Sequence, residues 1–239
     1  MSILIETLSS GAAELGINLT KIQLAMFEKH YQMMVEANKS FNLTAILDER
    51  EAALKHFVDS LTCLRAVAIK KGALILDVGA GAGFPGIPLK ICRPDLNITM
   101  IEAAEKKANF LKNVINELKL DNIEALHARA EDFGRNKNGR GKYDVVVSRA
   151  VAALAVLAEY CLPPLRAGGV FLAMKGPNIQ EEIKAAESAL AVLGGVLKKT
   201  VDIQLPLTGD RRKLVVIGKI KVTPAIYPRR AGIPAKNPL

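Results

Sequence analysis

Four closely spaced glycines follow a short apolar stretch in the first half of the chain. The stretch Leu74–Val78 is interrupted only by Asp77, and the glycines are Gly79, Gly81, Gly83 and Gly86. This pattern predicts a buried parallel strand that turns sharply into a helix. Glycine is favoured where the backbone takes a positive φ or approaches a ligand closely. Because a glycine turn before a helix N-terminus commonly binds a nucleotide, these residues are the first candidates for a cofactor site.

Two cofactors compete for this turn. The glycines from Gly81 to Gly86 match the dinucleotide pattern G-x-G-x-x-G, which favours an NAD-dependent oxidoreductase. In a dinucleotide site, however, the strand runs straight into the first glycine, whereas here Asp77 and Gly79 precede the hexapeptide. The order Asp-x-Gly-x-Gly-x-Gly is similar to motif I of S-adenosylmethionine-dependent methyltransferases, in which the turn holds the methionine part of the cofactor. Asp77 would then act on the turn, or through water on the amino-acid moiety. A turn without a ligand is the third interpretation.

Two acidic positions follow later predicted strands. The stretch 97–102 ends in Glu102, at the distance from the glycines where nucleotide-binding folds place an acid on the ribose hydroxyls. This position supports adenosine binding without choosing the cofactor, and a solvated strand-end acid is the alternative. Ala130 and Glu131 follow the third strand, where an acid would lie near the adenine edge or stabilise a helix N-terminus.

The exit of the fourth strand, Ser148-Arg149-Ala150, bears on the substrate. It lacks the Asn/Asp-Pro-Pro-aromatic pattern common in enzymes that methylate exocyclic amines. Pyrimidine C5 methylation needs a cysteine nucleophile, and Cys161 falls inside a predicted helix. Guanine N7 fits better because its lone pair needs no deprotonation. Arg149 would then donate to guanine O6, unless it is a surface or ion-paired arginine.

Lys175 and the pair His56 and Asp59 are weaker candidates. Lys175 ends the fifth strand, where a lysine could orient a base or hold a phosphate, or simply extend its amine to water. His56 and Asp59 lie three apart on a predicted helix and so share a face. They could act as an acid–base pair, but we favour a structural hydrogen bond into the neighbouring domain.

Alternating strand and helix patterns predict an α/β fold with a Rossmann-like, seven-stranded, mostly parallel sheet and an N-terminal helical extension. We place a helical region at 1–72, the sheet domain at 73–221 and a basic C-terminal segment, packed on that domain, at 222–239. The segment 134–142 is interpreted as a flexible basic loop. Predicted strands are 73–78, 97–102, 122–126, 143–148, 169–174, 200–205 and 213–220, and predicted helices of the sheet domain are 86–92, 104–118, 151–161 and 178–193.

Charge is concentrated at one end of the chain. The formal net charge is +9, and residues 211–239 carry eight Lys or Arg and no acid. Such a segment favours a polyanionic partner, most simply nucleic acid, over a solubilising tail. Its candidate RNA-binding residues are Arg211, Arg212, Arg229 and Arg230.

Several classes of protein are disfavoured by composition. No apolar stretch is long enough to predict a membrane span, and the N-terminus lacks the features of a signal peptide. The three cysteines are scattered and the three histidines lack metal spacing, so we expect no metal and a reducing, cytoplasmic location.

Taken together, the motifs resemble the RsmG (GidB) family of 16S rRNA guanine-N7 methyltransferases over almost the whole chain. The order of Asn-Leu-Thr-Ala-Ile, His-x-x-Asp-Ser-Leu and Gly-Phe-Pro-Gly-Ile-Pro is the specific part of the likeness. The chain differs from many members in lacking tryptophan and in having Glu102-Ala103 after the second strand. The matching segments are Asn42–Ile46, His56–Leu61, Asp77–Pro88, Lys106–Lys107, Phe110–Leu111, Arg129–Glu131, Ser148–Ala152, Lys175–Gly176 and Tyr227–Gly232.

The resemblance implies S-adenosylmethionine as cofactor and methylation of one guanine of 16S rRNA (guanine 527 in the family's rRNA convention). It implies a small ribosomal subunit or its precursor as partner, and we expect a monomer. It also adds Asn42, His56, Asp59 and Lys175 to an RNA-facing rim. A non-catalytic ribosome-assembly factor is the remaining alternative. The implied cofactor contacts are Gly79, Phe84, Ala130, Glu131 and Arg149, with the ribose near Glu102.

Overall fold

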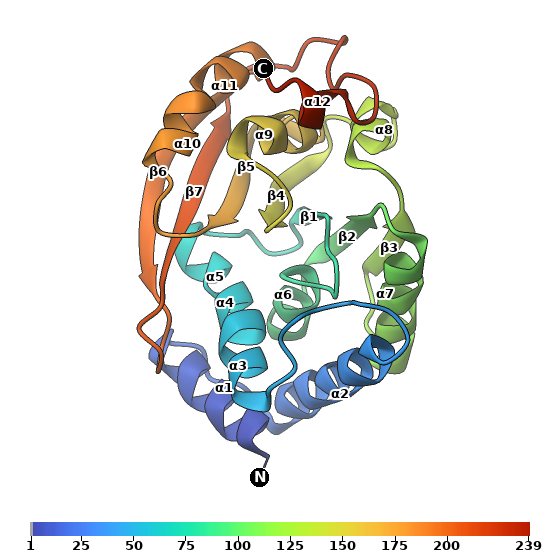
Figure 1. Cartoon of the computed structure of the whole chain (residues 1–239), viewed down its shortest axis with the longest axis vertical. Coiled ribbons are helices and arrows are strands. Elements are labelled where there is room, and N and C mark those ends of the chain that lie inside the picture. The colour runs from blue at the N-terminus through green and yellow to red at the C-terminus, as the bar shows by residue number, and fades with distance from the viewer. Residues whose placement is uncertain (1) are drawn as a thin grey trace.

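The computed structural model describes residues 2–239 and is built around one seven-stranded sheet in the order β3-β2-β1-β4-β5-β7-β6 (Figure 1). Strands β1 to β5 pair in parallel, whereas β7 pairs antiparallel with both β5 and β6. The predicted fold class, a seven-stranded and mostly parallel sheet, is therefore confirmed, and its last two strands form an antiparallel hairpin. The strands are β1 (Leu74–Val78), β2 (Asn97–Glu102), β3 (Ile123–His127), β4 (Tyr143–Arg149), β5 (Leu165–Lys175), β6 (Gly195–Gln204) and β7 (Arg211–Lys219).

The helices of the sheet domain follow the strands with small differences from prediction. The predicted helix 178–193 is divided at Ala186, and the predicted helix 151–161 begins only at Leu154 because its N-cap residue, Ala153, is extended (φ −61°, ψ 153°). The short helix after β3 was not among the predicted helices, but it matches the alternative in which Glu131 stands at a helix N-terminus. These helices are α6 (Gly86–Cys92), α7 (Glu105–Glu117), α8 (Ala130–Arg135), α9 (Leu154–Cys161), α10 (Gln180–Ala185) and α11 (Glu187–Leu193).

Strand β6 begins five residues earlier than predicted, and the reason is its place at the edge of the sheet. Gly194, in the left-handed conformation, ends α11 and lets the chain enter β6 at once. Residues 197–200 of β6 are exposed. An exposed, lysine-bearing edge strand lacks the apolar run that marks a buried strand, so the prediction started too late.

The two faces of the sheet are covered by different parts of the chain. Ile75, Ile98 and Val145 lie in one hydrophobic cluster with residues of the N-terminal helices, α6 and α7. Leu76 and Val146 lie in the second cluster, with α9 and α11. Because neighbouring residues of a strand face opposite sides, one apolar strand supplies both cores.

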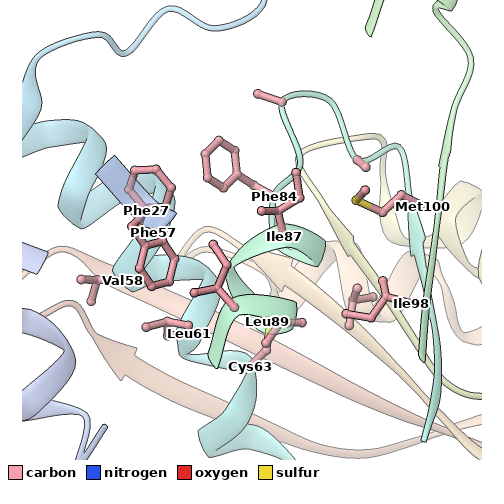
Figure 2. Packing of buried hydrophobic residues seen from close by; sticks show 14 of the residues in the cluster. Phe27, Phe57, Val58, Leu61, Cys63, Phe84, Ile87, Leu89, Ile98 and Met100 are labelled. Atoms are coloured by element: carbon pink, nitrogen blue, oxygen red, sulfur yellow. The ribbon is translucent and has the colours of Figure 1, made fainter. Parts of the chain in front are cut away.

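The N-terminal helices share their core with the sheet domain. Thr20 caps α2 through a capping box with Gln23, as a threonine before an apolar helix face predicts. The predicted helix that carries His56 and Asp59 is the end of an almost continuous helical run that includes a π-helical turn, η1. Figure 2 shows Phe27 and Phe57 of the helical region beside each other, in the same buried cluster as Ile87 of α6. The helices are α1 (Ile3–Glu14), α2 (Lys21–Asn38), α3 (Glu49–Ala52), η1 (Ala53–Val58), α4 (Asp59–Leu61) and α5 (Cys63–Ala66).

The C-terminal segment, residues 222–239, lies across the end of α9 near α8 and contains the short helix α12 (Ile233–Lys236) (Figure 1). Tyr227 packs against the second hydrophobic cluster. Within residues 2–239 no helix is both long and apolar enough to cross a bilayer.

We predict that Phe57→Ala lowers the free energy of unfolding by about 3–5 kcal/mol, the usual range for removing a buried phenylalanine. The Phe57 ring is fully buried and packs edge-on against Phe27 and Phe84, with ring centroids 5.3 Å apart in both pairs. Denaturant unfolding followed by circular dichroism should show one transition, because the helices and the sheet share this core. Ile22→Ala, at a residue 73% exposed, is the control and should change stability by less than about 0.5 kcal/mol. A separate early transition of the helices would contradict this prediction.

Candidate functional site

A cavity of about 510 Å³ opens where β1, β2, β3 and β4 end, and we call it the strand-end cavity. The sheet order reverses between β1 and β4, and ligands of open α/β sheets bind at such a switch point. Its wall comes from five parts of the chain. These are the helical region (Leu43, Thr44, His56), the glycine turn (Val78–Ala82, Phe84), the ends of β2 and β3 with the residues that follow (Ile101–Ala103, Lys107, Ala128–Glu131), the exit of β4 and α9 (Arg149–Val151, Tyr160) and the C-terminal segment (Gly232, Ala235).

The glycine turn is shaped so that backbone faces the cavity. Gly81 has a φ of 58°, and no atom lies within 4 Å of where its Cβ would stand. That position is therefore free for a ligand. Gly79 has a φ of 73°, and a Cβ there would lie 2.5 Å from Val151 Cγ2, so this glycine lets the β4 exit pack on the turn.

Asp77 supports the turn from below and does not line the cavity. Its Oδ2 accepts a hydrogen bond from the backbone N–H of Gly86 at 2.8 Å. Its Oδ1 is buried without a hydrogen-bond partner in residues 2–239. Burial raises the pKa of the Asp77 carboxyl to about 7, although the Gly86 N–H acts in the opposite direction. Of the two roles weighed for Asp77, its contacts match the one on the turn.

Glu102 lines the cavity and holds the glycine turn at the same time. Its Oε2 accepts from the Gly81 N–H at 3.0 Å, and its Oε1 accepts from the Ala104 N–H at 2.9 Å. The carboxylate thus joins the end of β2 to the turn after β1. A carboxylate has about four acceptor positions, so capacity is left for hydroxyl donors in the cavity.

Arg149 leaves the end of β4 and reaches the helical region. Its Nη1 donates to the Lys55 carbonyl and to Asp59 Oδ2, both at 3.0 Å. Its guanidinium carbon lies 4.9 Å from the centre of the Phe84 ring, which is cation–π distance. Burial raises the pKa of the Asp59 carboxyl, and the positive charge of Arg149 opposes that shift. Arg149 is therefore an ion-paired arginine that also faces the cavity.

His56 lies against the same guanidinium. Its Nδ1 is 3.4 Å from Arg149 Nη2, which is a donor, so Nε2 carries the ring proton and donates to Thr44 Oγ1 at 2.9 Å. Burial, followed by the charge of Arg149, lowers the pKa of His56 to about 3. His56 is thus a neutral, fully engaged ring at neutral pH.

His30 was not singled out from the sequence, yet it is a central contact of the glycine turn. Its Nε2 donates to the Ala82 carbonyl at 2.8 Å, and its ring stacks on Phe84 with centroids 5.2 Å apart. His56 also stacks on Phe84, at 4.6 Å. The available signal was its place on the apolar face of α2 with Phe27 and Met34, where a histidine needs a buried partner.

The loop that carries Asn42 is also held by a residue that sequence reasoning missed. Asn38 Oδ1 accepts from the N–H groups of Leu43 and Thr44 at 2.8 and 2.9 Å. Leu43 and Thr44 line the cavity, whereas Asn42 is exposed on the surface beside it.

Lys175 does not line the cavity. Its Nζ donates to the Ala152 carbonyl at 2.6 Å and pairs with Glu182 Oε1 at 2.5 Å. Glu182 Oε1 also accepts from the Leu154 N–H at 2.5 Å. The expectation that Lys175 contacts a bound base therefore does not match its position, because its amine is used to hold the loop between β4 and α9.

The four arginines predicted to bind RNA separate into two kinds. Arg229 is turned inward and pairs with the buried carboxylate of Glu159, with its Nη2 2.6 Å from Oε2. Arg212 is half-buried, with its Nε 3.5 Å from Asp59 Oδ1. Only Arg211 and Arg230 are exposed.

The lining suits an adenosine-containing cofactor. The volume is typical of a small-molecule site, the space beside Gly81 is open, and Glu102 offers acceptors at the ribose position expected for this fold. Ala130 and Glu131 line the far end, after β3. Cys161 is buried in α9, and burial raises the pKa of its thiol well above the ordinary range, so it is not poised as a nucleophile. Residues 2–239 contain no cluster of three or more His, Cys, Asp or Glu side chains that would hold a metal ion.

Comparison with known proteins was made at the level of family, sequence and structure. The family model described as rRNA small subunit methyltransferase G (GidB) matches residues 23–214. The protein called ribosomal RNA small subunit methyltransferase G of Pelotomaculum thermopropionicum is 57% identical over 239 residues, which is 100% of each chain. The protein of the same name from Bacillus subtilis is 45% identical over 235 residues, 98% of each chain.

A solved structure with the same fold is a SAM-dependent methyltransferase from Aquifex aeolicus. Its TM-score is 0.54 at 19% sequence identity, over 78% of this chain and 98% of that one. At this identity the likeness shows the Rossmann-like methyltransferase fold alone.

We predict that replacing His30 reduces the amount by which the free energy of unfolding falls in acid. Burial lowers the pKa of His30 from 6.5 to about 4, so between these values the ring takes up a proton only when the chain unfolds. Falling pH therefore favours the unfolded state, at up to about 1.4 kcal/mol per pH unit for one group. His30→Phe keeps a ring against Phe84 but cannot titrate. It should be less stable than the wild type at pH 7 and lose less stability on acidification.

The measurement is the free energy of unfolding in denaturant at several pH values between 7 and 4.5. Asp77 acts in the opposite sense. Because folding raises the pKa of its carboxyl from 3.8 to about 7, its contribution to the free energy of unfolding falls as pH increases between those values. The quantity that matters is thus the difference between wild type and His30→Phe. Parallel pH curves for the two proteins would contradict the prediction.

Proposed function

The chain belongs to the rRNA small subunit methyltransferase G (GidB) family, and on that premise we propose that it transfers a methyl group from S-adenosylmethionine to N7 of a single guanine of 16S rRNA. The observation that carries the proposal is the strand-end cavity, in which the glycine turn, Glu102 and Arg149 meet. We further propose guanine 527, in the family's rRNA convention, as the target. The substrate would be the small ribosomal subunit or its precursor, met by a monomeric enzyme in the cytoplasm.

The cofactor would be held mainly by backbone and by one carboxylate. Gly81 leaves room for the methionine part to approach the turn. Glu102 would accept hydrogen bonds from the ribose hydroxyls while it keeps its bonds to Gly81 and Ala104. Ala130 and Glu131 would border the adenine. Bound in this way, S-adenosylmethionine would supply an electrophilic methyl group.

The arrangement of residues favours a nucleophile that needs no base. Guanine N7 attacks through its lone pair and has no proton to lose. His56, with a pKa lowered to about 3 and both ring nitrogens engaged, is not free to take a proton. Asp59 is occupied by Arg149. The chain would therefore accelerate transfer by positioning the base in line with the methyl group.

Arg149 is our candidate for positioning the guanine. Its guanidinium has five N–H donors, and three hydrogen bonds, to Lys55, Asp59 and His56, fix it on the cavity wall. Donors remain for guanine O6, a pairing whose geometry arginine favours. We propose that Lys175 acts one step away, by holding the 150–153 loop through Ala152.

The exposed basic residues support contact with RNA. Arg211, Arg230 and the polar side chain of Asn42 are exposed, and residues 211–239 carry no acid. Binding that depends on such charges weakens steeply as salt rises. Salt dependence alone would not separate a methyltransferase from a non-catalytic RNA-binding factor.

The decisive experiment combines the purified protein, methyl-labelled S-adenosylmethionine and small ribosomal subunits that lack the modification. The RNA is digested and the labelled nucleoside identified. We expect the label in 7-methylguanosine at one site. Label in another nucleoside would overturn the N7 proposal. Absence of label with intact RNA binding would favour the assembly-factor alternative.

We predict that Arg149→Lys lowers the rate of methyl transfer by at least about tenfold, the loss of roughly 1.4 kcal/mol of transition-state stabilisation. Lysine keeps a positive charge beside Asp59 but cannot reproduce the planar fork that bonds two groups at once. Arg166→Lys is the matched control, because Arg166 forms an exposed pair with Asp144. It should keep the wild-type rate. Single-turnover kinetics on the same subunits would measure both, and a wild-type rate for Arg149→Lys would sink this assignment.

A further inference from the structure

The C-terminal segment, which the sequence suggests is an RNA-facing element, also builds part of the strand-end cavity. Gly232 and Ala235 line the cavity from this segment. The family match ends at residue 214, so the match does not cover these residues. The segment follows β7 and returns over α8 and α9 (Figure 1).

Arg140 holds the first part of this segment. The guanidinium donates to the carbonyls of Thr223, Pro224 and Tyr227 at 2.6, 3.0 and 2.6 Å. Arg140 comes from the stretch interpreted as a flexible loop. The structure corrects that interpretation for Arg140, because its guanidinium is fixed by hydrogen bonds to backbone carbonyl oxygens.

The Glu159 carboxylate of α9 holds the middle of the segment. Glu159 is only 1% exposed, and its two oxygens accept from the backbone N–H, Nε and Nη2 of Arg229. A nearly buried carboxylate is stable only when it is paired and hydrogen-bonded, so this contact has one strongly preferred geometry. The positive charge of Arg229 is therefore paired with Glu159 within the protein.

Glu131 connects the segment to the cavity itself. Its Oε1 accepts from the Gly232 N–H at 2.8 Å, and both residues line the cavity. Glu131 is 4% exposed. The residue that borders the adenine end in the proposed function is thus the residue that fixes the segment over that end.

We propose that Gly232 and Ala235, held in place through Arg229 and Glu131, form the wall of the cofactor site at its adenine end, so that the C-terminal segment sets the affinity for S-adenosylmethionine in the absence of RNA. This rests on the proposed function, since it takes S-adenosylmethionine as the ligand. A segment that only faced RNA would present its charges outward and would leave cofactor affinity unchanged when altered. Arg229 and Gly232 instead point their donors at Glu159 and Glu131.

The test exploits two alanines of the same segment and the absence of tryptophan from the chain. Ala231 and Ala235 are both exposed, so both accept a larger side chain, but only Ala235 lines the cavity. In Ala235→Trp the indole would occupy space that the adenosine needs. In Ala231→Trp it would lie outside. S-adenosylmethionine is titrated into each full-length protein without RNA, by calorimetry and by indole fluorescence.

We expect Ala235→Trp to raise the Kd by about tenfold or more, equal to 1.4 kcal/mol, and its emission to change during the titration. Ala231→Trp should keep the wild-type Kd within about twofold with unchanged emission. A wild-type Kd together with unchanged emission in Ala235→Trp would overturn the inference. A wild-type protein that binds no S-adenosylmethionine would instead overturn the proposed function, and this inference with it.

A second pair separates the wall from an RNA contact. Arg229→Gln and Arg230→Gln each remove one positive charge from adjacent positions, so long-range attraction to RNA falls similarly in both. Only Arg229 is bonded to Glu159. Weaker cofactor binding in Arg229→Gln alone, measured well below its melting temperature, supports the wall. Equal cofactor affinity in both variants, with weaker RNA binding in both, would mean that the segment contacts RNA without affecting the cofactor site. That result would contradict the inference.

Discussion

The burial of one guanidinium is the constraint on which the site depends. Arg149 ends β4 at the strand-end cavity, and its side chain is only 15% exposed. A charge in such a place is stable only when it is paired and its donors are bonded. Asp59, the Lys55 carbonyl and His56 provide those partners, and all three belong to the helical region. The cavity wall is therefore complete only when the helices and the sheet are packed together.

The glycine turn is also held by polar side chains, from several sides. His30 donates to its Ala82 carbonyl, Glu102 accepts from Gly81, and Asp77 accepts from Gly86. The Phe84 ring of this turn lies 4.9 Å from the guanidinium carbon of Arg149, and His30 and His56 stack on the same ring. Because the two histidines are buried and neutral, they act as rings and hydrogen-bonding groups. A turn held on so many sides is preorganised, which suits a reaction that depends on positioning.

Local patterns predicted the parts of the fold that depend on local physics. The bounds of β2 and α6 match the prediction, because apolar runs and glycine turns are read within a few residues. The start of strand β6 was predicted too late, since an edge strand has few buried apolar residues from which it can be recognised. The inward pairing of Arg229 and the role of His30 were missed. Both depend on partners far away in sequence, Glu159 and Ala82, which only the tertiary structure brings within reach.

The central claim is that the pairing of Arg149 with Asp59 joins the two parts of the molecule at the cavity. A double-mutant cycle with Asp59→Leu and Arg149→Met tests it, with the free energy of unfolding as readout. Arg149→Met leaves Asp59 with only the longer contact to Arg212, and Asp59→Leu leaves Arg149 without its carboxylate, whereas the double change removes both members of the pair. We predict that the loss of unfolding free energy in the double variant is at least about 1 kcal/mol smaller than the sum of the losses in the two single variants. Effects that add within about 0.5 kcal/mol would contradict the claim.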